Sequence, residues 1–258
     1  METAFITGAS GGIGLEIAKI FAQNKVNLIL VARSESKLND LAKELKQQNV
    51  DVKIYVKDLS ILANAEEIYN DIKKQNIVID YVINNAGFGT SGIFTDTEWN
   101  KDLEMLNLNI ITLTYFTKIF GNDMKKRGCG KILNVASTGA YQPVPYMSAY
   151  AATKAYVLNL SEAANYELRR TGVSISSLCP GYTETGFADT AKIVGTKMVA
   201  NKSTTATAKD VAEYGYKLMM KNKSSGIHGK LNNLMVFFQR FVPKKIVIKI
   251  AGSLLGKN

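Results

Sequence analysis

Short apolar runs alternate with longer amphipathic segments along most of the chain. The apolar runs are rich in β-branched residues and predict strands at Thr3–Thr7, Val26–Ala32, Val52–Val56, Tyr81–Asn84, Lys131–Ala136 and Val173–Cys179, with a weaker candidate near Gly226–Leu231. The segments between them place apolar residues every three or four positions. They predict helices at Ile13–Gln23, Glu35–Gln48, Asn64–Gln75, Glu98–Arg127, Ala149–Arg170 and Lys209–Met220.

This regular alternation of strand and helix predicts an α/β fold. Strands that are apolar throughout, such as residues 28–31, suit a sheet covered by helices on both faces, and strand–helix–strand units make right-handed crossovers. We therefore expect one Rossmann-type, doubly wound parallel sheet with helices on both faces. Such sheets bind ligands at the carboxyl ends of their strands, so the loops after the strands are where chemistry is expected.

The positive charge is concentrated at the C-terminal end. The 258 residues include 32 Lys and Arg and 22 Asp and Glu, a net charge of +10. Nine of those bases and none of the acids follow Glu213, so residues 1–213 carry 23 bases and 22 acids, a net charge of +1. The charge pattern thus separates a nearly neutral body from a basic tail, and we expect a dinucleotide-binding and catalytic domain over 1–230 and an apolar, basic extension over 231–258.

Three hypotheses account for the extension at this stage. It covers the substrate entrance or a subunit interface, it lies on an anionic membrane surface as an amphipathic helix, or it attracts an anionic substrate. Nucleic acid is disfavoured as a partner, because the bases alternate with large aliphatic residues and form no recognition motif.

The remaining composition excludes several classes of protein. Cys129 and Cys179 are too far apart for a zinc site and too few for a disulfide scaffold, and the single His228 argues against metal binding and Ser-His-Asp hydrolysis. No secretory signal fits the first residues, and basic residues and a proline interrupt the most apolar stretch, Leu231–Leu255. We expect a cytoplasmic protein without a metal, with peripheral membrane association as the alternative.

The loop after the first strand is rich in glycine. Glycines let the backbone turn sharply and approach a pyrophosphate, whose charge is stabilised at a helix N-terminus. The residues expected to contact a dinucleotide here are Gly8, Ser10, Gly12, Ile13 and Gly14. A tight turn without a ligand is the alternative.

The end of the second strand favours NADP over NAD. An NAD-binding fold would show a carboxylate there to bind the ribose hydroxyls, but this chain has Ala32 and Arg33. A guanidinium pairs with a 2′-phosphate, and the neighbouring sequence offers no carboxylate to compete with it. The alternative is a solvated arginine.

After the next strands, Asp58 and Leu59 are candidates to contact the adenine, and Asn85, Ala86 and Gly87 are candidates to contact the flat part of the ligand.

Tyr150 and Lys154 lie four residues apart, which makes them neighbours on a helix. A nearby cation favours the phenolate, so we expect the pKa of Tyr150 to fall from about 10 toward neutrality and the phenol to serve as an acid or base. Tyr69 and Lys73 have the same spacing. They are interpreted as a solvated helical face, because acidic residues surround them, whereas Tyr150 follows the loop that contains Ser137.

These motifs together resemble the short-chain dehydrogenase/reductases, especially NADP-preferring members, over about residues 1–230. The resemblance rests on the glycine loop, Asn84-Asn85-Ala86-Gly87, Asn109, Ser137, Tyr150-x-x-x-Lys154 and Pro180-Gly181. It implies that Tyr150 is the acid/base and that Ser137 holds the substrate oxygen. It also implies that Lys154 lowers the Tyr150 pKa and bonds the nicotinamide ribose, and that Asn109, rather than its neighbour Asn107, anchors a water beside Lys154.

The resemblance extends to the later loops and to assembly. The loop after the sixth strand is implied to meet the nicotinamide through Pro180, Gly181, Thr183 and Thr185. Ala136 stands where many members have a second serine. The C-terminal extension is similar to the tails of relatives of 3-oxoacyl-CoA reductases and 17β-hydroxysteroid dehydrogenases, and the two longest helices imply a homodimer or homotetramer.

The expected substrate wall is apolar. Gly139–Met147 contains no Lys or Arg, and both this stretch and the residues just after Thr185 contain aromatic or aliphatic side chains. We therefore expect hydride transfer between NADP(H) and a hydrophobic carbonyl or alcohol. The alternative is a catalytically silent NADP-binding regulator or membrane-peripheral interaction protein, against which the complete set of Ser137, Tyr150 and Lys154 argues.

Overall fold

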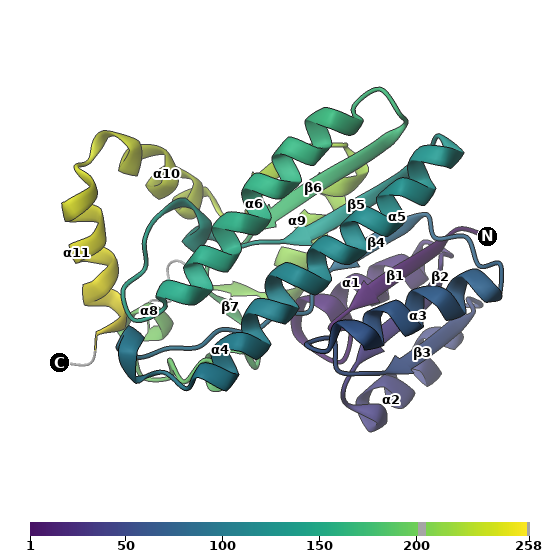
Figure 1. Cartoon of the computed structure of the whole chain (residues 1–258), viewed down its shortest axis with the longest axis horizontal. Helices are drawn as coiled ribbons and strands as arrows, with labels where there is room; N and C mark the ends of the chain where they lie inside the picture. The colour runs from purple at the N-terminus through teal and green to yellow at the C-terminus, as the bar shows by residue number, and fades with distance from the viewer. Residues whose placement is uncertain (201–204, 257–258) are drawn as a thin grey trace.

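A seven-stranded parallel sheet forms the centre of the computed structural model, which describes residues 1–200 and 205–256 (Figure 1). The strand order is β3-β2-β1-β4-β5-β6-β9, so the order reverses direction between β1 and β4. The strands are β1 (Thr3–Thr7), β2 (Asn27–Ala32), β3 (Val52–Val56), β4 (Tyr81–Asn84), β5 (Gly130–Val135), β6 (Val173–Cys179) and β9 (Ser225–Ile227). The predicted doubly wound fold is confirmed.

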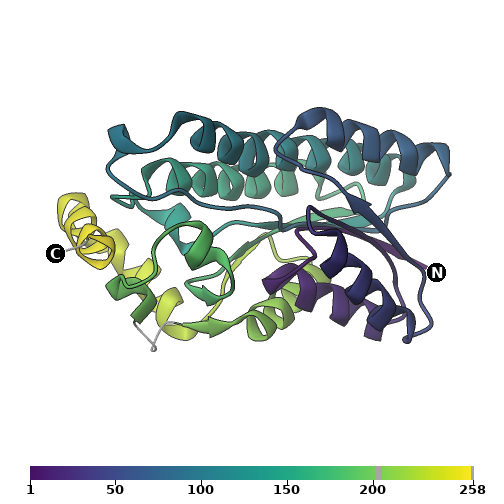
Figure 2. The same ribbon diagram turned by 90° about the horizontal axis from the view of Figure 1, so that it is seen from below.

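Helices cover both faces of the sheet (Figure 2). One layer contains α1 (Gly12–Gln23), α2 (Glu35–Lys46) and α9 (Ala208–Met220), and the other contains α3 (Leu62–Lys74), α5 (Leu113–Arg127) and α6 (Ser148–Leu168). The ring of Phe5 on β1 lies 4.9 Å from that of Phe116 and 5.1 Å from that of Phe120, measured between centroids. These aromatic contacts anchor α5 to the middle of the sheet.

The helix predicted over Glu98–Arg127 is not continuous. It comprises α4 (Trp99–Leu106), a π-helical segment (Asn107–Thr112) and α5. No Gly or Pro marks the break, which is why periodicity missed it. The wider π turn coincides with tertiary hydrogen bonds from the Asn109 side chain to the loop after β4.

The final strand and the tail also differ from the prediction. Ser225–Ile227 form the strand expected near Gly226–Leu231, and Lys230 already begins α10 (Lys230–Phe238), which is followed by α11 (Lys244–Leu255). Between β6 and α9 lie the short elements β7 (Thr183–Glu184), α7 (Phe187–Thr190), α8 (Lys197–Ala200) and β8 (Ala206–Thr207). None of these was predicted, because each is too short for periodicity to show.

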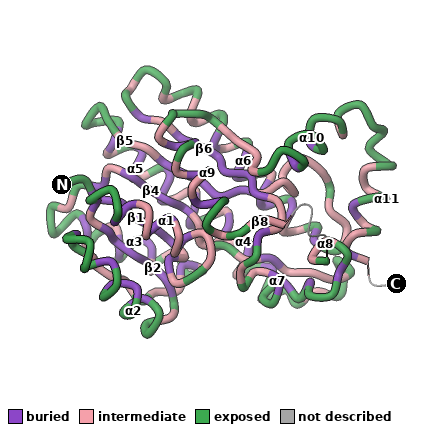
Figure 3. The backbone as a smooth tube through the Cα atoms, turned by 180° about the vertical axis from the view of Figure 1, so that it is seen from behind, coloured by how far each residue is buried: buried purple, intermediate pink, exposed green. Residues whose placement is uncertain are grey.

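The two C-terminal helices project from the body of the molecule beside α8 (Figures 1 and 3). Much of their backbone is exposed in Figure 3, whereas the sheet is mostly buried. Within residues 1–200 and 205–256, no helix is long and apolar enough to span a bilayer. Lys257, one of the nine tail bases, lies outside the described residues.

A buried polar network lies beneath the carboxyl end of the sheet. Asn84 on β4 pairs in register with Asn134 on β5, and its Nδ2 donates to Asn134 Oδ1 at 2.8 Å and to Thr117 Oγ1 at 3.1 Å. Asn134 Nδ2 donates to Ser161 Oγ on α6 at 3.0 Å. The network links two strands to the helices that follow them, and in a buried setting each lost partner leaves a group unsatisfied.

We expect Asn134→Ala to lower the free energy of unfolding by about 2–4 kcal/mol, because it leaves Asn84, Thr117 and Ser161 without their shared partner. Urea unfolding followed by circular dichroism measures the change. Asn70→Ala on the exposed face of α3 is the control and should alter stability by less than about 0.5 kcal/mol. Equal stability of the two variants would contradict the role of the network.

Candidate active site

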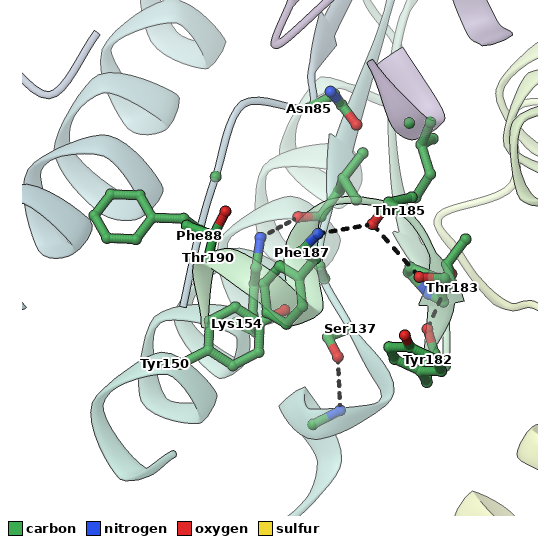
Figure 4. Close-up of a pocket in the computed structure, with 18 of the residues that line it drawn as sticks. Asn85, Phe88, Ser137, Tyr150, Lys154, Tyr182, Thr183, Thr185, Phe187 and Thr190 are labelled. Atoms are coloured by element: carbon green, nitrogen blue, oxygen red, sulfur yellow. Dashed lines mark hydrogen bonds between the residues drawn. The ribbon is translucent and has the colours of Figure 1, made fainter. Parts of the chain in front are cut away.

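A cavity of about 570 Å³ opens at the carboxyl ends of β1, β4, β5 and β6, where the sheet order reverses (Figure 4). Most of the predicted site residues line it, namely Gly8, Ser10, Gly12, Ile13, Arg33, Asn85, Ala86, Gly87, Ser137, Tyr150, Lys154, Pro180, Gly181, Thr183 and Thr185. Four predicted residues do not. Gly14 packs against the Gly8 carbonyl, Leu59 lies in the core, Asp58 sits at the end of β3, and Asn109 is buried behind Gly87.

The glycine loop leaves room that a side chain would fill. Gly8 has φ +67° and Gly12 has φ +55°, a region that favours glycine. A Cβ on Gly12 would lie 2.9 Å from Thr185 Cγ2 on the opposite wall. No side chain caps the start of α1, so its first amides are free to bind an anion.

Hydrogen bonds fasten this loop to the end of β4. The amides of Asn85 and Ala86 both donate to Thr7 Oγ1, at 3.0 and 2.9 Å. Asn85 Nδ2 in turn donates to the carbonyls of Thr7 (3.0 Å) and Gly8 (3.2 Å). These side-chain hydrogen bonds therefore connect β1 and β4 beyond the last backbone pairing of the two strands.

Arg33 does have a carboxylate nearby, contrary to the expectation from its local sequence. Its Nη1 lies 3.8 Å from Asp58 Oδ2, because β2 and β3 are adjacent and end at the same edge. Burial raises the pKa of Asp58, but hydrogen bonds from the Ser60 amide and hydroxyl, with a smaller contribution from the Arg33 charge, hold it below its ordinary value. Lys37 at the start of α2 lines the same end of the cavity and was not predicted.

Ser137, Tyr150 and Lys154 converge from two neighbouring elements (Figure 4). Ser137 lies two residues after the end of β5, and its Oγ accepts from the Gly139 amide at 3.1 Å, which leaves the hydroxyl proton to donate elsewhere. Tyr150 and Lys154 lie one turn apart on α6, and Lys154 Nζ is 5.7 Å from the centre of the Tyr150 ring. Lys154 is buried and donates to the Val135 carbonyl at 2.8 Å.

The Tyr150 pKa shifts in the direction opposite to that predicted. Burial raises it to about 12, and interaction with the Ser137 hydroxyl only partly offsets the increase. Burial also lowers the pKa of Lys154 to about 8. For the protein without a ligand, desolvation therefore affects the Tyr150 pKa more than the nearby Lys154 charge does, because both side chains lie in a low-dielectric pocket.

Asn109 lies behind the site and is fully buried, whereas the alternative, Asn107, is only half-buried. Its side chain exchanges hydrogen bonds with the Phe88 backbone and donates to Thr153 Oγ1 at 3.1 Å. A Cβ on Gly87 would lie 2.9 Å from Asn109 Oδ1 and 3.4 Å from Lys154 Nζ, so these groups are close neighbours. The water expected at Asn109 stays a prediction.

In the second tyrosine–lysine pair, Tyr69 packs against the core, whereas Lys73 remains exposed to solvent. The Tyr69 ring packs on Phe120 with centroids 5.5 Å apart, and its hydroxyl donates to Asp123 at 3.0 Å. Lys73 pairs with the same Asp123 carboxylate. The prediction of a solvated face was therefore wrong for Tyr69, because its partner helix α5 lies about fifty residues away in sequence, and it agrees with the exposure of Lys73.

The C-terminal helix contributes to the site, which motif analysis did not predict. Ala251, Leu254 and Leu255 of α11 line the cavity. Leu255 packs with Met147 and with residues of the segment after β7. At the base of α10, the Asn232 side chain lies against Gly181 so closely that a Cβ there would overlap it. The three- and four-residue spacing of these α11 positions is the pattern that could have indicated a buried face.

Comparisons with known proteins match this sequence and this fold. A sequence model described as short chain dehydrogenase matches residues 2–193, which include β1 through β7. Ketoacyl reductase HetN of Nostoc sp. is 30% identical over 230 residues, 88% of this chain and 77% of that protein. An uncharacterized oxidoreductase of Staphylococcus epidermidis is 32% identical over 184 residues, 71% of this chain and 79% of that protein.

A solved structure gives the same result. A short-chain dehydrogenase from Sphingobium yanoikuyae, solved in complex with NADPH, matches with a TM-score of 0.83 and 28% identity, covering 93% of this chain and 94% of that one.

The buried Lys154 predicts a pH-dependent stability. Its pKa is about 8 in the folded chain and near 10.5 when unfolded, so between these values the unfolded state binds more protons and stability rises with pH. Below pH 8 the full penalty of burying the charge applies. The free energy of unfolding of Lys154→Met, relative to the unsubstituted protein, should therefore fall by roughly 3 kcal/mol between about pH 7 and 10.5.

Urea unfolding at several pH values measures this difference. Lys118→Met, at an exposed position on α5, is the matched control and should show a difference that does not vary with pH. A pH-independent difference for Lys154→Met would contradict the shifted pKa.

Proposed function

The chain belongs to the short-chain dehydrogenase/reductase family of oxidoreductases, and on that premise we propose that it reduces hydrophobic carbonyl compounds with NADPH. The observation that carries the proposal is the cavity itself. It joins Ser137, Tyr150 and Lys154 at one end to the glycine loop and Arg33 at the other.

The residues present fit a dinucleotide. The backbone at Gly8 and Gly12 leaves a cradle that a Cβ would close, and the uncapped start of α1 offers amides to a pyrophosphate. Arg33 and Lys37 place two cations at the end of the cavity where β2 meets α2. Two cations favour the 2′-phosphate of NADP, and Asp58 would orient Arg33 toward it. The NADPH-bound relative from Sphingobium supports this preference.

The proton step depends on Tyr150. A bound reduced nicotinamide supplies the hydride. With a pKa of about 12 in the protein alone, the Tyr150 phenol holds its proton at neutral pH and can donate it to the carbonyl oxygen as that oxygen becomes an alkoxide. The Ser137 hydroxyl, which interacts with Tyr150 in the structure, can donate its proton to the same oxygen, and Lys154 lies close enough to stabilise the phenolate that remains.

The cavity wall beside Tyr150 favours a hydrophobic substrate. Its apolar side chains come from four segments that are distant in sequence, and they are Phe88, Val144, Met147, Tyr182, Phe187, Met198, Leu254 and Leu255. Among the described residues that line the cavity, Lys154 is the one cation outside the Arg33 end. A ketone or 3-oxoacyl chain suits such a wall better than a small carboxylate. The name of the Nostoc relative, a ketoacyl reductase, supports this class.

We also propose that the protein self-associates through α4, α5 and α6. Leu103, Ile111 and Tyr156 on this side are large apolar or aromatic residues with exposed side chains. Exposed apolar residues on neighbouring helices suit a helical interface between two copies. The domain proposed over 1–230 contains this surface and every strand of the sheet.

We expect Tyr150→Phe to reduce the rate of NADPH oxidation by about 10²–10⁴-fold with a hydrophobic ketone, because the proton donor is removed. NADPH binding, measured by fluorescence titration, should change little. Tyr166→Phe, an exposed tyrosine on the same helix, is the matched control and should retain full activity. An unchanged rate in Tyr150→Phe would exclude the proposed mechanism.

We expect Arg33→Ala to raise the KM for NADPH by about 10- to 100-fold, the effect of losing a hydrogen-bonded charge pair, while the KM for NADH changes little. Steady-state assays with both cofactors measure the ratio. Arg170→Ala, an exposed arginine beyond the end of α6, is the control. If Arg33→Ala raises the KM for NADPH and the KM for NADH by equal factors, the assignment of the 2′-phosphate to Arg33 is wrong.

A further inference from the structure

The C-terminal hairpin, which we define as residues 230–255, exposes a dense apolar surface. Phe238, Phe241 and Ile250 are 54%, 73% and 55% exposed. Other exposed apolar side chains on the hairpin are Leu231, Leu234, Met235, Phe237, Val242 and Ile246. The rings of Phe237, Phe238 and Phe241 contact one another, with centroids 5.4 and 5.6 Å apart. A water-soluble protein rarely leaves so many large apolar residues together unless they bind something.

The same hairpin carries positive charge and no negative charge. Its bases are Lys230, Arg240, Lys244, Lys245 and Lys249, all exposed, and the chain has no Asp or Glu after Glu213. The adjoining segment from α7 through α8 adds the exposed Lys192 and Lys197 against one exposed acid, Asp189. Aromatic side chains interspersed with lysines are the chemistry that binds an anionic lipid surface.

The hairpin also forms a wall of the active-site cavity. The inner face of α11 presents Ala251, Leu254 and Leu255 to the cavity, while Ile246, Lys249 and Ile250 point outward. Gln239 Nε2 at the end of α10 donates to the Tyr141 carbonyl at 3.2 Å, in the turn that begins at Ser137. One helix therefore separates the cavity from the exposed apolar surface.

A second copy of this chain is a poor occupant of that surface. A two-fold interface brings the same patch of both copies together. Five bases would then face five bases with no acid on either hairpin, and like charges brought together oppose association. A partner with many negative charges and an apolar interior matches both properties of the surface.

We propose that the hairpin docks on an anionic lipid leaflet and thereby places the cavity next to the membrane, where it can receive carbonyl substrates dissolved in the lipid. The substrate clause rests on the proposed function, whereas docking itself does not. Figure 1 shows α10 and α11 projecting away from the sheet and its covering helices, so a flat surface can reach them without contacting the sheet layer.

The test is co-sedimentation of the full chain with vesicles. The unsubstituted protein should sediment with phosphatidylcholine vesicles that contain phosphatidylglycerol, remain largely in solution with phosphatidylcholine alone, and be released by about 0.5 M salt, which screens charges beyond a few ångströms. Lys244→Gln with Lys245→Gln should weaken partitioning roughly 30-fold, since each lysine near an anionic surface contributes about fivefold. Phe238→Ser with Phe241→Ser should weaken it as well.

The matched control replaces two exposed lysines at the opposite, amino-terminal edge of the sheet. Lys221→Gln with Lys223→Gln removes the same charge and should alter partitioning less than the hairpin pair does. Circular dichroism and NADPH titration establish that all variants are folded. Vesicle binding involves no turnover, and NADPH oxidation with a water-soluble ketone tests the proposed function separately.

Three results would overturn the proposal. The first is absence of vesicle binding, or equal binding to neutral and anionic vesicles. The second is an equal loss of binding in the control and hairpin lysine variants. The third is a dimer in solution that Phe238→Ser with Phe241→Ser dissociates while no form sediments with lipid, which would assign the surface to a second copy.

Discussion

The hydrogen bonds between Thr7 and the Asn85–Ala86 backbone hold together the point on which the rest of the site depends. Parallel strands β1 and β4 are neighbours in the sheet, but their following segments leave in different directions, one into α1 and the other toward α4. Such a divergence opens a crevice, which needs rigid edges if it is to bind a long ligand. The side chains of Thr7 and Asn85 make these edges rigid. Each side chain hydrogen-bonds to backbone groups at the end of the other strand, where the backbone pairing of β1 and β4 stops. Gly14 then packs directly against the Gly8 carbonyl, at a distance that leaves no room for a Cβ.

The chemistry at the other end of the crevice is controlled by burial. Tyr150 and Lys154 are neighbours, yet burial raises the pKa of the phenol and lowers that of the ammonium, because neither charge is well solvated in the pocket. A phenol that keeps its proton is suited to donate it. The polar network of Asn84, Asn134 and Ser161 lies below and makes the local backbone rigid, so Ser137 and Tyr150 are presented from two fixed elements.

The structure shows where the basic tail lies, which its charge alone did not indicate. Of the three hypotheses for it, covering the substrate entrance agrees with the lining of the cavity by Ala251, Leu254 and Leu255. That position does not exclude membrane contact, because a helix has two faces and the outer face of α11 is exposed. Five of the nine bases that follow Glu213 lie on the hairpin, so much of the net charge of +10 belongs to this wall of the site, whereas residues 1–213 carry a net charge of +1.

The sequence by itself determined the features that depend on neighbouring residues. Alternating apolar runs predicted the strands, four of which have the predicted bounds, and the spacing of Gly8, Gly12, Tyr150 and Lys154 predicted most residues of the cavity. These properties follow from local periodicity and backbone sterics, which a single chain displays directly.

Only the tertiary structure decided what depends on residues far apart in the chain. The pairing of Arg33 with Asp58, the attachment of Tyr69 to Asp123, the π-helical turn at Asn109 and the role of α11 as a cavity wall each require elements separated by at least twenty residues to meet. The same holds for the pKa of Tyr150. Spacing indicated a cation nearby, but the loss of water around the phenol arises only when β5, α6 and the segment after β7 close over it, and that desolvation is the larger effect.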